Sequence, residues 1–412
     1  MTHSPLYISR RQMLRTGASA LVLGAAGEGL TFGMMPSLAR AATETQKAND
    51  RILVVLELSG ANDGLNTLIP YADDAYYKLR PRIGIPQNKL IKLDDRYGLS
   101  GGMKGFEKLY KDGKLAVVHG CGYEQPNFSH FTSMAYWHTA APNSGQALGW
   151  VGRLADNMRP EGAQNFIVNI DDQQSLAVNS SHHTPVVFND PERFMRKGDA
   201  VTRPEFQHVD EGDTAGNASQ KFLAEVAKSA RDASTQVREA WTGYKTPVEY
   251  GVLALGLNKV AALIAANMPT RFYYTSYPHI AFDTHVHQGD VHARQLSYVS
   301  ESVAAFLRDM ERIGRADDVS VLIFSEFGRR AAENTSLGTD HGTANLMFVA
   351  GKPVKGGHYG APSSLTALMP DGNLQYTVDF RRVYATMIEG WLQHKDSAAV
   401  LRDKFETFPI FA

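Results

Sequence analysis

The sequence contains a single cysteine, Cys121, among its 412 residues. One thiol cannot form an intramolecular disulfide, so the fold depends on its hydrophobic core, for which a hydrophobic share of 43% is ample. The chain also lacks an excess of charge, because 42 basic and 43 acidic residues give a formal net charge of -1. This balance argues against a nucleic-acid-binding groove and against a polybasic membrane-binding surface.

The beginning of the chain has the layout of a twin-arginine export signal. Residues 9–14 read SRRQML, and a weakly apolar stretch follows at residues 16–27. That stretch is short and is followed by Glu28, so it predicts no stable membrane anchor. Small residues flank Arg40, which predicts cleavage after Ala41. We therefore expect the twin-arginine (Tat) translocase as a partner during export, and a mature protein in the periplasm or outside the cell.

The rest of the chain alternates short aliphatic runs with amphipathic segments. Strands are expected at residues 51–60, 115–119, 166–170, 186–188, 271–277, 319–324 and 346–349. Helices are expected at residues 128–139, 290–314 and 380–393, and two helical segments at 219–267 meet at Thr246-Pro247. This alternation predicts an α/β fold over residues 50–412, with a mostly parallel sheet and helices on both faces. The length also allows two domains, but a polar stretch rich in Pro and Gly favours a partly helical insertion at about 189–268.

Polar residues gather where the predicted strands end, the edge of an α/β sheet at which ligands bind. The candidates for metal ligands there are Asp63, Asp283, His285, His287, Glu326, Asp340 and His341. Carboxylates and imidazoles on one edge repel or desolvate one another unless a cation lies among them, so they predict a divalent metal. Zn²⁺ and Mn²⁺ are the preferred candidates for this metal, and Mg²⁺ and Ca²⁺ are further candidates. Arg329 and Arg330 would then hold an anionic substrate.

Each candidate also has a purely structural interpretation. Asp63 could form an Asx turn, Asp283 could cap a helix, and Asp340 could brace a loop. Glu326 and Arg329 could form a structural ion pair. Four histidines are interpreted as ordinary surface or core residues: His130, His138, His182 and His183.

Six segments, SGANDGLN, NFSHF, FDTHVHQ, VLIFSEFGRR, GTDHG and VKGGHYG, occur in this order between Arg51 and the end of the chain. Together they resemble a family of exported bacterial proteins called domain of unknown function number fifteen hundred and one. That family is distantly similar to the alkaline phosphatase and sulfatase superfamily. The resemblance implies an alkaline-phosphatase-like α/β core with a two-metal site.

The resemblance also implies roles for individual residues. Asp63 matches the metal aspartate after the first strand, and Ser129 matches the nucleophile at a helix start. The remaining metal positions match Asp283 with His285 or His287, then Glu326, and finally Asp340 with His341. Phe327 departs from the pattern, because the superfamily usually has a histidine there. The sulfatase signature is absent, since Cys121 is followed by Gly-Tyr-Glu, which argues against a formylglycine sulfatase.

These similarities lead to two expectations of function. The first is an exported metal-dependent hydrolase of phosphate or sulfate esters that acts on a small anionic ester. The alternative, motivated by Phe327, is a catalytically degenerate binding or assembly protein of the cell envelope with the same fold. Metal content and ester hydrolysis distinguish the two.

Overall fold

The computed structural model describes residues 51–194 and 232–411, so the predicted signal at 1–41 and part of the predicted insertion lie outside the described residues. Its centre is a nine-stranded sheet. Eight strands follow one another across it in the order β13 (Gly357–Tyr359), β5 (Leu115–Gly122), β12 (Asn345–Ala350), β9 (Val319–Phe324), β1 (Ile52–Glu57), β8 (Phe272–Ser276), β6 (Ile167–Ile170) and β7 (Val186–Phe188). The ninth, β14 (Val378–Asp379), also pairs with β5.

Most neighbouring strands in this sheet are parallel, which confirms the predicted α/β class. Strand β12 is the exception, because it runs antiparallel to both β5 and β9. Its N-terminal end therefore lies at the edge where β5, β9 and β1 have their carboxyl ends. This reversal brings the segment just before β12 to the same edge as the loops that follow the parallel strands.

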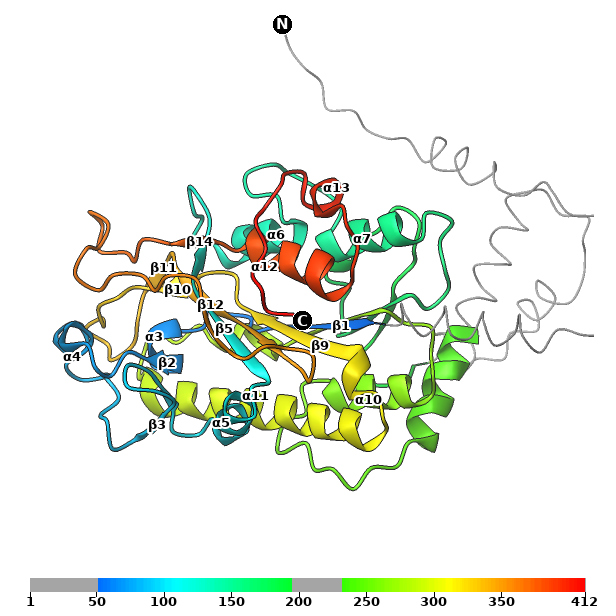
Figure 1. The fold of residues 1–412 in the computed structure, drawn as a ribbon, viewed down its shortest axis with the longest axis horizontal. Helices are drawn as coiled ribbons and strands as arrows, with labels where there is room; N and C mark the ends of the chain where they lie inside the picture. Colours follow the sequence, from blue (N-terminus) through cyan, green and yellow to red (C-terminus); the bar gives the residue numbers. More distant parts are fainter. Residues whose placement is uncertain (1–50, 195–231, 412) are drawn as a thin grey trace, which may run out of the picture. The chain divides into compact units, whose positions relative to one another are not determined.

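The sheet is covered on both faces (Figure 1). One face packs against α5 (Lys104–Lys111), α10 (Leu257–Ala265) and α11 (Gln288–Arg312), and the other against α6 (His130–Thr139), α7 (Trp150–Met158), α12 (Arg381–Ala385) and α13 (Ser397–Leu401). In β1, for example, Val54 belongs to the first core and Leu53 to the second. Two-sided burial explains why the strand sequences are continuously apolar. None of the helices in residues 51–194 and 232–411 is both long and apolar enough to cross a bilayer.

Smaller elements surround the carboxyl edge of the sheet. Two further sheets are β10 (Gly328–Arg329) with β11 (His341–Gly342), and β2 (Leu68–Ile69) with β4 (Gly98–Ser100) and β3 (Leu90–Lys92). Further helices are α3 (Gly64–Thr67), α4 (Asp74–Leu79), helical residues 232–243, three 3₁₀ turns (Leu176–Val178, Pro278–Ile280, Ala316–Asp318) and a π-helical turn, Thr386–Trp391, that continues α12.

One helix prediction was wrong in its extent. The segment after Thr246-Pro247 does not become helical until Leu257, and Val252 within it is 80% exposed. The reason lies in α11, where the buried carboxylate of Asp309 accepts hydrogen bonds from the hydroxyls of Tyr244, Thr246 and Tyr250. These side-chain bonds hold the segment in an extended path along α11.

Candidate metal centre

Three imidazoles and one carboxylate meet at the carboxyl edge of the sheet. Asp283 Oδ1 lies 2.9 Å from His285 Nε2 and 3.2 Å from His341 Nε2, and its Oδ2 lies 3.4 Å from His130 Nε2. The Nε2 atoms of His285 and His341 are 2.9 Å apart. Ligand atoms of His130, Asp283 and His341 all lie within 4.8 Å of one another. We call these four residues the His–Asp cluster.

Three separate segments supply the cluster. His130 is the first residue of α6, which follows β5, whereas Asp283 and His285 lie in the loop between β8 and α11. His341 belongs to β11, just before the antiparallel β12. Each segment reaches the same sheet edge, since parallel strands end there and β12 begins there.

Each imidazole is also held from its outer side by an oxygen atom. The Nδ1 contacts are 2.6 Å from His130 to Glu326 Oε1, 3.3 Å from His285 to Asp340 Oδ1, and 2.8 Å from His341 to the Phe128 carbonyl oxygen. For His130 and His341 the oxygen at Nδ1 is closer than the Asp283 oxygen at Nε2, which favours a proton on Nδ1 and a lone pair on Nε2. His285 has its closer oxygen, Asp283 Oδ1, at Nε2. The Nε2 atoms of all three rings point into the cluster.

This arrangement fits a bound cation. The Nε2 atoms of His285 and His341 lie 2.9 Å apart, and Asp283 Oδ1 lies within 3.2 Å of both, so three atoms of metal-binding type converge on one point. His130 Nε2 is buried and makes no hydrogen bond within the described ranges; its 3.4 Å approach to Asp283 is an ion-pair distance only. Nitrogen and carboxylate donors in one cluster are those of divalent transition metals.

The charges around the cluster also suit a ligand role. Burial raises the pKa of Asp283, but the hydrogen bond and the charge of Arg329 outweigh burial and lower it to about 2. Burial lowers the pKa of His341, although the hydrogen bond with Asp283 acts in the opposite direction. At neutral pH the carboxylate is therefore ionised and the imidazole uncharged, which are the forms that bind metal.

The side chain of Arg329 holds several loops in place through hydrogen bonds to their backbone. Its guanidinium is buried and donates to the carbonyl oxygens of Ala61 (2.7 Å), Gly60 (2.7 Å), Phe282 (3.1 Å) and Thr339 (2.9 Å), besides Asp283 (2.7 Å). These bonds occupy Nε, Nη1 and Nη2. Arg330 points elsewhere and donates to the Asp371 carbonyl oxygen. Arg329 is thus engaged by the protein itself, whereas Arg330 keeps a buried Nε that has no hydrogen-bond partner among the described residues.

Asp63 lies outside the cluster and has its own partners. Its Oδ1 caps α3 by accepting from the backbone of Leu65 and Asn66. Its Oδ2 accepts from Arg80 Nη1 at 2.6 Å and from Gln288 Nε2 at 2.5 Å. Burial raises the pKa of Asp63, but the adjacent Arg80 guanidinium more than compensates, and the pKa is lowered overall.

The other predicted residues take peripheral positions. His287 is exposed at the N-cap of α11, with a left-handed φ of 45°. Ser129 is exposed at the N-cap of α6, and its hydroxyl does not cap the helix. Glu326 and Asp340 support histidine rings rather than join the cluster, and Glu326 also accepts from the Gly60 N–H at 2.9 Å.

His130 was missed as a candidate, having been interpreted as an ordinary histidine. The available signal was its place in NFSHF, one residue after Ser129 at the start of a helix that follows a buried strand. Among the other histidines, His138 is buried and lies 2.6 Å from Glu57 Oε2, and His183 contacts backbone carbonyl oxygens. The fully buried Phe327 packs on the cluster, with ring centroids 5.0 Å from His130 and 4.8 Å from His341.

Comparison with solved structures gives distant similarities, among them the three that follow. The lipoteichoic acid synthase LtaP from Listeria monocytogenes shares 8% identity at a TM-score of 0.35, over 79% of this chain and 68% of that one. The PsFucS1 sulfatase from Pseudoalteromonas sp. shares 10% at 0.39, over 92% and 76%. A protein in the alkaline phosphatase superfamily from Vibrio parahaemolyticus shares 9% at 0.34, over 75% and 62%.

Comparison with sequences gives a clearer result. No curated protein matches the chain. Residues 113–405, which are most of the chain, match the family described as "Protein of unknown function (DUF1501)". The resemblance carried by the six sequence segments is thereby confirmed. The chain belongs to the DUF1501 family.

Proposed function

We propose that this chain is an exported, metal-dependent hydrolase of phosphate or sulfate esters. One observation carries the proposal: three imidazoles, each held at Nδ1 by an oxygen, converge through Nε2 on one carboxylate. His130, His285, His341 and Asp283 would hold a single divalent metal. Three nitrogen donors favour Zn²⁺ or Mn²⁺ over Mg²⁺ and Ca²⁺, which prefer oxygen ligands.

A metal held there supplies a Lewis acid that polarises the ester and activates a nucleophile at neutral pH. The protein keeps the donors ready for it. Arg329 holds Asp283 in its ionised form, and Glu326 fixes the ring orientation of His130. Phe327 covers one side of two imidazoles and excludes water from that side.

The first turn of α6 is the proposed binding site for the anionic part of the substrate. His130 begins this helix, and no side chain caps its N-terminus. Uncapped N–H groups at a helix N-terminus bind phosphate and sulfate oxygens well. This role replaces the one expected of Arg329 and Arg330. Ser129, exposed at the same helix end, is the proposed nucleophile, and a water molecule is the alternative.

A second candidate is a binding or assembly protein of the cell envelope that has kept the metal and lost catalysis. Phe327 favours it, because an apolar ring stands where the distant superfamily has a histidine. The donors of Arg329, which are all engaged by the protein, favour it as well. In this function the metal would hold a ligand or stabilise the loops.

Metal content tests the first half of the proposal. Protein purified without chelators should contain about one equivalent of Zn or Mn by mass spectrometry, and His341→Ala should lose most of it. His182→Ala is the matched control, since His182 is exposed and distant in sequence from the cluster. Wild-type protein that stays metal-free and gains no thermal stability from added Zn²⁺ or Mn²⁺ would refute the proposal.

Turnover tests the second half. Aryl phosphates, aryl phosphodiesters and aryl sulfates should include at least one substrate, with hydrolysis abolished in His341→Ala and strongly reduced in Ser129→Ala. Unchanged turnover in Ser129→Ala would assign the attack to water. Metal binding without any turnover would support the binding protein.

Export is tested separately by Arg10→Lys with Arg11→Lys, which should retain the precursor in the cytoplasm.

A further inference from the structure

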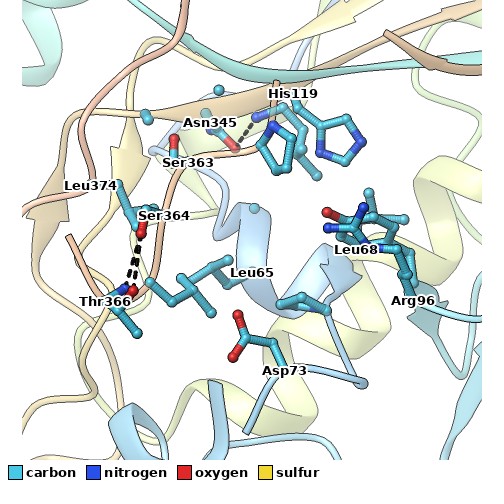
Figure 2. Close-up of a pocket in the computed structure, with 18 residues that line it drawn as sticks. Leu65, Leu68, Asp73, Arg96, His119, Asn345, Ser363, Ser364, Thr366 and Leu374 are labelled. Atoms are coloured by element: carbon cyan, nitrogen blue, oxygen red, sulfur yellow. Dashed lines mark hydrogen bonds between the residues drawn. The ribbon is translucent and has the colours of Figure 1, made fainter. Parts of the chain in front are cut away.

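A pocket of about 220 Å³ lies near α3 and the start of β12, and it shares no lining residue with the His–Asp cluster (Figure 2). Its wall is formed by the N-terminus of α3, the loop before α4, Arg96 and Tyr97 before β4, the end of β5, the start of β12 and residues 362–366. Pockets for drug-sized ligands measure roughly 300 to 1,000 Å³. This pocket therefore suits a smaller group, about the size of one sugar ring.

His119 is one of two buried polar side chains in the pocket wall, the other being Asn345, and 4% of His119 is exposed. Its Nε2 lies 2.8 Å from His358 Nδ1, and His358 Nε2 lies 3.1 Å from Asp94 Oδ2. The carboxylate favours a proton on His358 Nε2, which leaves His358 Nδ1 to accept a hydrogen bond from His119 Nε2. His119 Nδ1 is then a lone pair, and no residue in the described part of the chain donates to it.

The remaining wall combines hydrogen-bonding and apolar groups. Asp73 uses Oδ1 to cap α4 through the Ala75 N–H at 2.9 Å, which leaves Oδ2 as a second acceptor. Burial and the adjacent His358 lower the pKa of His119 to about 4, so the ring is neutral at pH 7, with Nε2 donating to His358 and Nδ1 able to accept. Leu65 and Leu68 add apolar surface (Figure 2).

A ligand for this wall must carry several donors on an otherwise compact ring. Acceptors at His119 and Asp73 require at least two O–H or N–H groups, and the guanidinium of Arg96 in the same wall can donate to a ligand oxygen. The apolar wall would cover the C–H face of the ring. We propose that this pocket binds a pyranose sugar through its hydroxyl groups, with His119 Nδ1 and Asp73 Oδ2 as the acceptors. The proposal does not depend on the metal centre.

Isothermal titration with D-glucose, D-galactose, D-mannose and N-acetyl-D-glucosamine tests this inference on the full chain. At least one sugar should bind, and tetrahydropyran-2-methanol, a ring of similar size that carries a single hydroxyl, should not. His119→Phe should weaken binding at least tenfold. Asp73→Asn should weaken it several-fold while keeping the helix cap, since asparagine caps as well as aspartate. Asp74→Asn, next to Asp73 but outside the pocket wall, is the matched control and should leave binding unchanged.

The outcomes separate this site from the metal centre. Sugar binding that persists in His341→Ala and falls in Asp73→Asn supports the pocket, whether or not the protein hydrolyses esters. Four results overturn the inference: no sugar binds at 100 mM, the control ring binds as tightly as the sugars, Asp73→Asn and His119→Phe both bind like wild type, or His341→Ala abolishes binding. If His119→Phe does not fold, Asp73→Asn decides alone.

Discussion

Arg329 donates a hydrogen bond from Nη2 to Asp283 Oδ1 across 2.7 Å, and the guanidinium that does so is completely buried. The same carboxylate oxygen lies 2.9 Å from His285 Nε2. Arg329 therefore connects the backbone of three loops to the centre of the His–Asp cluster. Its positive charge is one reason that the pKa of Asp283 falls to about 2 despite burial.

Replacing this arginine by lysine should destabilise the protein, although the charge is kept. One ammonium group cannot reach Ala61, Gly60 and Thr339 together, so several buried carbonyl oxygens lose their donor. We expect Arg329→Lys to lower the free energy of unfolding by about 2 to 4 kcal/mol, measured by chemical denaturation. Arg330→Lys, the neighbouring control, should cost less than about 1 kcal/mol. Equal effects would contradict the positioning role.

The two histidines of FDTHVHQ should differ sharply in their contribution to metal binding. His285 points Nε2 at Asp283, whereas His287 is exposed at the N-cap of α11. His285→Ala should lower metal affinity by about 10-fold or more, since it removes a donor. His287→Asn, chosen because asparagine tolerates the left-handed backbone at this position, should leave affinity unchanged. Competition with a chromogenic chelator measures both, and loss of metal in both variants would argue against this assignment.

Asp63 should matter for stability and not for metal. In Asp63→Asn the helix cap survives, but the side chain of Arg80, which has no exposed surface, loses its counter-ion. Breaking a buried pair in this way costs about 3 to 5 kcal/mol. Denaturation should detect this loss, while metal content stays at the wild-type level. Asp73→Asn is the control, because Asp73 caps α4 from an exposed position. Loss of metal in a folded Asp63→Asn protein would restore Asp63 as a ligand.

The carboxylate of Asp309 should make stability depend on pH. Burial raises its pKa, but the hydrogen bonds from Tyr244, Arg312 and Thr246 prevail and lower it. Because the native pKa lies below the unfolded value of about 3.9, the ionised group stabilises the native state fully above about pH 4. That contribution disappears as the pH falls through the native pKa. The unfolding free energies of wild type and Asp309→Asn should therefore converge as the pH falls below about 4 and through the native pKa. Asp317→Asn, at an exposed carboxylate, should show a constant difference from wild type.

Local patterns in the sequence were sufficient for the class of fold. Continuous aliphatic runs predicted the buried strands, and the spacing of Leu296, Val299 and Val303 predicted α11, because such patterns follow from which faces are buried. The helix predicted directly after Pro247 does not form there, because hydrogen bonds from Thr246 and Tyr250 to the distant Asp309 outweigh the local helix propensity. The motifs that contain the candidate residues carried the resemblance to the DUF1501 family.

The sequence by itself thus determined the α/β class, the family and the edge of the sheet at which polar groups collect. Only the tertiary structure decided which of those groups face one another. Glu326 lies 196 residues from His130 in the sequence, and yet its carboxylate contacts Nδ1 of the His130 ring. The carbonyl oxygen of Phe128, 213 residues from His341, contacts Nδ1 of the His341 ring in the same way. Local sequence sets where a side chain starts, but its direction and its partners depend on packing between distant segments. For this reason the sequence did not show that Asp63 pairs with Arg80, that Arg329 binds backbone carbonyl oxygens of three loops, or that His130 belongs to the His–Asp cluster.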